Sequence, residues 1–85
     1  MTYVYSDDFM AKTPDGGVAW SGTIRTADNA LVCETYNLGD GGPNRYAWAS
    51  PEMQYQFEAD AQSKYAESFE PLDAFVADLW EQTVA

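Results

Sequence analysis

The chain has 85 residues, enough for one small domain. Apolar residues make up 46% of it, which excludes a disordered chain. Fourteen Asp and Glu residues against four Lys and Arg residues give a net charge of −10, and this sign argues against direct binding to nucleic acid or to anionic lipid. At least ten carboxylates therefore have no basic partner within the monomer.

The chain lacks the residues that usually carry nucleophilic and zinc chemistry. It has no His and a single cysteine, Cys33, so it offers neither an intramolecular disulfide nor a nucleophile–histidine pair. Asp15 and Asp40 precede glycines but lie outside the EF-hand pattern. Acidic pairs such as Asp78 and Glu81 lie on an exposed helical face, which implies no pocket for acid–base work. We expect no enzymatic activity, no catalytic residues, no metal and no cofactor.

The sequence also predicts where the protein resides. No apolar run approaches the ~20 residues of a membrane helix. The N-terminus lacks a basic segment followed by an apolar one, so no secretory signal is indicated. We expect a soluble protein in the cytoplasm, which would be the cytoplasm of the host cell if a phage encodes it.

The first half of the chain is typical of antiparallel strands. Thr2–Ser6 is aromatic and β-branched, and the residues after it, through Lys12, fit either a single helical turn or a continued strand. Pro14–Gly17 is a turn, because proline presets φ and glycine accepts positive φ. Val18–Thr26 alternates along its length, as a half-buried strand does. Ala30–Tyr36 follows a tight connection, which predicts a β-hairpin.

A glycine-rich loop, Leu38–Asn44, follows this hairpin. It lacks the Lys-Ser/Thr pair of a phosphate-binding loop and does not open a helix, so we interpret it as a structural loop whose tip could contact a partner. Arg45–Ala49 is then a short strand. If the chain forms a homodimer, Ala30–Tyr36 is one candidate edge strand.

Two helices are predicted between Ser50 and Thr83. Ser50 is an N-cap whose hydroxyl can accept from a free N–H, and Pro51 and Pro71 stand at first helical positions, where the missing N–H has no cost. Apolar side chains recur at three- and four-residue steps on one face of each helix: Met53, Phe57, Ala61 and Tyr65, then Leu72, Phe75, Val76, Leu79 and Thr83. We expect a single α+β domain, with three or four antiparallel strands (residues 1–49) followed by two helices packed on one face (residues 50–85).

Carboxylates concentrate on these helices, since the chain from Glu52 onward carries eight acidic residues and one Lys. Successive helix turns lie about 5.4 Å apart, a spacing on the order of that between phosphates, which recur every ~3.4 Å along one strand. We expect a surface that binds a basic partner protein in place of nucleic acid, although a merely solvated face or salt adaptation also fits. Its predicted residues are Glu58, Asp60, Glu67, Glu70, Asp73, Asp78 and Glu81, with Tyr55 and Trp80 as aromatic contacts.

Small size, strong acidity and helical carboxylates make the chain resemble a class of phage-encoded inhibitors of host defence. This class includes anti-CRISPR proteins, restriction inhibitors and the uracil-DNA glycosylase inhibitor, several of which mimic DNA. The resemblance implies a non-enzymatic inhibitor, monomeric or homodimeric, whose partner is a Cas protein, a Cascade subunit or another nucleic-acid-binding defence protein. Glu67, Glu70, Asp73, Asp78 and Glu81 would then stand in for phosphates. The alternative is an acidic bacterial interaction module or homo-oligomeric structural protein that does not compete with nucleic acid.

Overall fold

A computed structural model describes residues 2–84 of the chain, with side chains through residue 82. The predicted place of Thr83 on the core face therefore lies outside the described side chains. Six elements follow one another along the chain: β1 (Tyr3–Lys12), β2 (Val18–Thr26), β3 (Leu31–Asn37), β4 (Arg45–Trp48), α1 (Pro51–Lys64) and α2 (Pro71–Val84).

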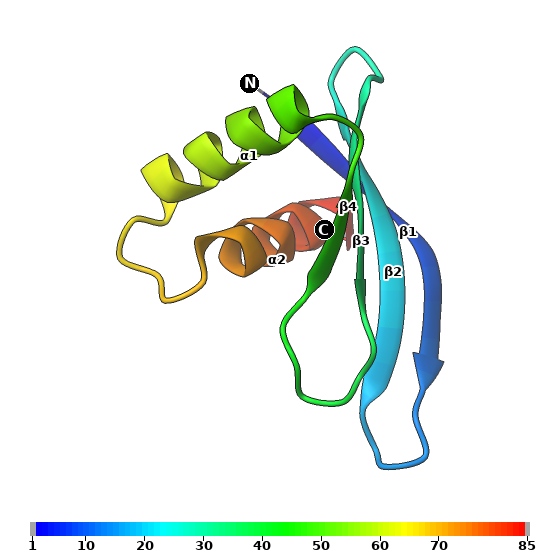
Figure 1. Ribbon diagram of the computed structural model, residues 1–85. Helices are drawn as coiled ribbons and strands as arrows, with labels where there is room; N and C mark the ends of the chain where they lie inside the picture. Colours follow the sequence, from blue (N-terminus) through cyan, green and yellow to red (C-terminus); the bar gives the residue numbers. More distant parts are fainter. Residues whose placement is uncertain (1, 85) are drawn as a thin grey trace.

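The four strands form one antiparallel sheet in the order β1-β2-β3-β4. Both helices lie on the same face of this sheet (Figure 1). The α+β arrangement predicted from the sequence is confirmed. β3 pairs with β2 on one side and with β4 on the other, so the suggestion that Ala30–Tyr36 is an edge strand is wrong. The predicted short strand β4 pairs with Cys33–Tyr36 and covers this side of β3.

The first strand stays extended where the sequence left a helical turn open. Its register with β2 shifts between Asp7, which pairs with Gly22, and Phe9, which pairs with Ser21. Asp8 is the extra residue of this β-bulge. A bulge reverses the alternation of side chains beyond it, because side chains in a strand alternate between the two faces.

The bulge decides which side chains of β1 face the helices. Before it, Tyr3 and Tyr5 are buried under the helix layer. After it, Met10 pairs with Trp20 on that same face, and Phe9 turns to the uncovered face, where 57% of its surface is exposed. Without the bulge, Phe9 would continue the series of Tyr3 and Tyr5.

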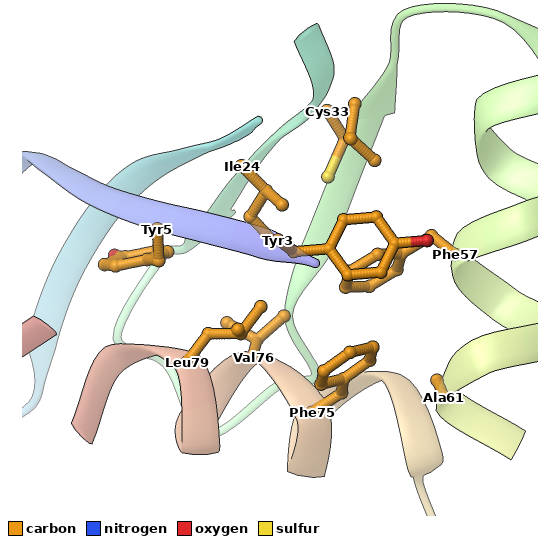
Figure 2. Close-up of a cluster of buried hydrophobic side chains, with 10 residues drawn as sticks. Tyr3, Tyr5, Ile24, Cys33, Phe57, Ala61, Phe75, Val76 and Leu79 are labelled. Carbon is orange, nitrogen blue, oxygen red and sulfur yellow. The ribbon is translucent and has the colours of Figure 1, made fainter. Parts of the chain in front are cut away.

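The core is an aromatic cluster between the sheet and both helices (Figure 2). Phe57 of α1 and Phe75 of α2 stack with their ring centroids 4.8 Å apart. Tyr3 of β1 meets both rings edge-on, at 4.8 Å from Phe57 and 5.6 Å from Phe75. Offset and edge-on contacts of this kind add about 0.5–1.5 kcal/mol each beyond burial. These three rings therefore join three elements at one point.

The start of α1 follows the predicted chemistry. The Ser50 hydroxyl accepts from the backbone N–H of Met53 at 3.2 Å, and Pro51 is the first helical residue. Phe57 and Ala61 are buried on the predicted core face. The Ser50 cap and the proline at the first helical position together determine where α1 begins.

We predict that Gly22→Ala destabilises the fold. The Tyr5 ring lies over Gly22, and a Cβ at this position would collide with the ring. The ring cannot move without disturbing the core, so we expect a loss of about 1–3 kcal/mol in the free energy of unfolding. Urea denaturation measures this loss. Ser21→Ala, one residue along the same strand, is the control, and equal effects from the two substitutions would contradict the prediction.

Candidate functional site

The described residues offer no metal centre and no reactive thiol. Among residues 2–84, no group of three or more His, Cys, Asp and Glu side chains is placed to hold a metal ion. Cys33 is fully buried, and burial raises the pKa of its thiol to about 12. This thiol therefore stays protonated at neutral pH. Neither helix in the described part of the chain is long and apolar enough to cross a membrane.

The structure divides the predicted carboxylate surface into two groups. Asp60, Asp73 and Asp78 are half-buried and accept hydrogen bonds from tyrosine hydroxyls of other elements. The expectation that Asp78 lies on an exposed helical face is therefore wrong, and Asp73 is not on an exposed face either. Glu58 is half-buried as well, whereas the three remaining predicted carboxylates are exposed: Glu67, Glu70 and Glu81.

The reason for this correction is helical geometry. A position three residues away on a helix lies roughly 60° around the axis. Asp73 stands in this relation to Val76, and Asp78 to Phe75, so both carboxylates border the buried arc instead of opposing it. A tyrosine hydroxyl extends beyond its ring and can reach such a border position.

One hydrogen bond of this kind joins β1 to α1. The Tyr3 hydroxyl donates to Asp60 Oδ2 at 2.6 Å. Burial, followed by the hydrogen bond to Asp60, raises the pKa of Tyr3 above its ordinary value. A buried phenol without an acceptor would be costly, so the Asp60 carboxylate satisfies a polar group of the core.

Two further hydrogen bonds hold α2. The Tyr46 hydroxyl of β4 donates to Asp73 Oδ1 at 2.6 Å, and the backbone N–H of Asn44 donates to Asp73 Oδ2 at 3.3 Å. The Tyr65 hydroxyl, at the C-cap of α1, donates to Asp78 Oδ2 at 2.6 Å. Its hydrogen bond to Asp78, and secondarily burial, raise the pKa of Tyr65 to about 12. The sheet and α1 are thus each joined to α2 by a hydrogen bond to an aspartate of α2.

The connection between the helices is acidic and carries one exposed ring. We call Glu67–Glu70 the acidic link. Its Phe69 is 98% exposed, although an apolar ring normally finds cover. The hydrogen bond between Glu70 and Asp73, and then their charge repulsion, raise the pKa of Glu70. The sequence analysis missed Phe69, yet an aromatic residue between two glutamates in a short connection was a visible signal.

The two predicted aromatic contacts are exposed at different sites. Tyr55 on α1 is 76% exposed. Trp80 on α2 is 38% exposed and lines a groove between α2 and the sheet. Tyr55 is not among the residues that line this groove, so the structure does not join the two rings into one site.

The groove has a volume of about 400 Å³. It lies where residues of β1, β2, the β3–β4 loop and α2 meet: Tyr5, Asp7, Met10, Trp20, Asn44, Asp73, Val76, Ala77 and Trp80. The sequence analysis did not find it, because Met10 reaches this face through the bulge in β1. Its walls are aromatic and aliphatic, with two carboxylates among them.

The face of the sheet opposite the helices is uncovered (Figure 1). Ser21 pairs with Phe9 on one side and with Tyr36 on the other, so three neighbouring strands place these residues in one row. Phe9, Tyr36 and Val4 of this face are exposed. We call this row and Val4 the open face.

Comparison of the chain with protein-family models, with curated proteins and with solved structures gives no match.

We predict that the hydrogen bond between Tyr3 and Asp60 stabilises the domain. Tyr3→Phe removes the hydroxyl and leaves a half-buried carboxylate without this donor. Hydrogen bonds to charged groups contribute about 1.5–3 kcal/mol, so the free energy of unfolding in urea should fall by that amount. Tyr55→Phe is the matched control, because that ring is exposed, and its effect should stay within about 0.5 kcal/mol. Similar effects from both variants would rule out the proposed contribution.

We predict a loss of stability at alkaline pH that begins above pH 10. The pKa of Tyr65 rises from its ordinary 10.0 to about 12 in the fold. A raised pKa means that this stabilisation is complete below pH 10 and is lost as the pH passes through about 12. Urea unfolding measured from pH 8 to pH 11.5 should therefore show a flat region and then a decline. Tyr65→Phe should decline less steeply; an unchanged decline would show that Tyr65 is not responsible.

Proposed function

We propose that the chain is a non-enzymatic inhibitor that binds a basic, nucleic-acid-binding surface of a host defence complex, as an anti-CRISPR protein does. The observation that carries this proposal is the acidic link, in which Phe69 is 98% exposed between Glu67 and Glu70. Interface hot spots combine an aromatic anchor with charges that attract the partner. A ring this exposed contributes nothing to the core, so a partner is the simplest reason for its presence.

Charge supports the same conclusion over a longer range. The net charge of −10 attracts cationic surfaces and repels nucleic acid. Two of the five predicted phosphate-like residues, Asp73 and Asp78, accept hydrogen bonds from tyrosines, as does Asp60 of the same predicted surface. The phosphate-like role therefore rests on Glu67, Glu70 and Glu81. Tyr55 of α1 adds a second exposed ring on the helix layer. The favoured partner is a Cas protein or a Cascade subunit.

The open face supports a second candidate function. Phe9, Tyr36 and Val4 are exposed apolar and aromatic side chains on this uncovered face of the sheet. Such a face fits a homo-oligomeric structural or interaction module, in which the acidic residues serve solubility. In that case the protein would not compete with nucleic acid.

A competition experiment tests the proposed inhibition. Purified CRISPR effector complexes loaded with guide RNA are mixed with labelled target DNA, and DNA binding is followed by mobility shift as the protein is added. We expect at least one complex to lose DNA binding, and we expect added salt to weaken the inhibition because charge steers the association.

Two charge-reversal variants locate the binding surface. Glu67→Lys/Glu70→Lys should weaken inhibition about tenfold or more, because it reverses the charges beside Phe69. Glu34→Lys/Asp40→Lys has the same net charge but alters the sheet and its loop, and it should inhibit nearly as well as the unmodified protein. Inhibition by no complex, or equal loss in both variants, would contradict the proposal. If, in addition, the protein is a dimer and Phe9→Asp dissociates it, the second candidate function, a homo-oligomeric structural module, is favoured over the inhibitor.

A further inference from the structure

The groove beside α2 combines features that fit one kind of ligand. Its volume of about 400 Å³ lies near the lower end of the roughly 300–1,000 Å³ typical of ligand sites. This size suits one long side chain or small molecule better than a folded segment. The β1–β2 hairpin, whose strands contribute four of the lining residues, extends beyond the helix layer (Figure 1).

Most of the side chains that line the groove are apolar. The bulge in β1 brings Met10 to the helix face, where it pairs with Trp20 of β2. Trp80 and Val76 of α2 complete these walls. Met10 is 58% exposed and Trp80 is 38% exposed, so two large side chains remain available to an occupant.

Carboxylates accompany these rings. Asp7 enters the groove from β1 and Asp73 from α2. Tyr46 and Asn44 hold Asp73 in place, which fixes one carboxylate in the wall before any ligand arrives. The lining residues in the described part of the chain include no Lys or Arg, so the two negative charges have no cation beside them. An occupant of complementary charge is cationic.

We propose that this groove binds the guanidinium group of an arginine side chain presented by a partner protein. Arginine matches each feature of the site. Its planar head can stack on tryptophan faces and its N–H groups match a carboxylate, while its aliphatic stem can pack on the exposed side chain of Met10. A lysine ammonium is more strongly hydrated and cannot stack in this way.

The inference goes beyond the proposed function, since the groove would take an arginine whether or not the partner binds nucleic acid. The proposal for the acidic link and the proposal for the groove can also be contradicted independently of each other. Inhibition of an effector complex without arginine binding would leave the proposed function intact. Arginine binding without any inhibition would support the proposal for the groove and contradict the proposed function.

Three tryptophans make the test direct. The protein is labelled with ¹⁵N and titrated with N-acetyl-arginine-amide, while the indole N–H signals are followed by NMR. We expect saturable shifts of Trp20 and Trp80, with dissociation in the millimolar range because a single side chain is bound. Trp48 stacks on Tyr46 and does not line the groove, so its signal should stay in place. The lysine and norleucine analogues should shift the signals less.

Variants then assign the contacts. Asp7→Asn removes a charge but keeps the shape, and it should raise the dissociation constant about threefold or more. Trp80→Ala should abolish saturable binding. Glu34→Gln removes a charge from another strand and Phe9→Ala removes a ring from the open face, and neither should change binding.

Four results would overturn the proposal. The first is equal binding of the norleucine analogue, which would make the groove merely apolar. The second is equal binding of the lysine analogue, which would exclude selection of a guanidinium. The third is a common shift of all three indole signals, which would indicate non-specific association. The fourth is no shift at any soluble concentration of the arginine analogue.

Discussion

The hydrogen bond from a tyrosine hydroxyl to an aspartate carboxylate is the interaction on which this small domain depends. In the described part of the chain, three such hydrogen bonds join different parts of the fold: β1 to α1, β4 to α2, and the end of α1 to α2. A phenol at the edge of an aromatic core needs an acceptor, and a half-buried carboxylate needs a donor. The phenol donates and the carboxylate accepts, so both polar groups are satisfied. Aspartates therefore attach the helix layer to the sheet, even though the chain has few basic residues.

The negatively charged residues of the helix layer therefore fall into two groups, one that stabilises the fold and one that is exposed. Asp60, Asp73 and Asp78 serve the interior, where tyrosine hydroxyls donate hydrogen bonds to their carboxylates. Glu67 and Glu70 are exposed on either side of Phe69. The acidic surface is therefore smaller than the sequence suggests, and an exposed ring gives it a centre. A compact acidic site of this kind fits recognition of a local basic patch better than imitation of a long nucleic-acid strand.

The bulge in β1 has consequences on both faces of the sheet. It moves Phe9 onto the open face and Met10 into the groove with Trp20, so a single extra residue provides side chains for two surfaces. The groove is also tied to the core, because Tyr46 and Asn44 position the Asp73 carboxylate in its wall. Asp73 thus stabilises the fold and would also serve the proposed arginine site, whose wall is fixed by the packing of the sheet against α2.

The sequence by itself determined most of the elements, although it left the second half of β1 open. The Pro-Asp-Gly-Gly turn, the alternation in Val18–Thr26, the Ser50 cap and the proline-led apolar faces of both helices are local signals, and local signals suffice for strands, turns and helices. The tertiary structure decided the direction of particular side chains. The three-residue spacing to Val76 and Phe75 already places Asp73 and Asp78 at the border of the buried arc, but only the packing of α2 brought tyrosines from other parts of the chain to them. Only the paired strands revealed the bulge and the groove. Contacts across many residues depend on register and packing, which no local pattern encodes.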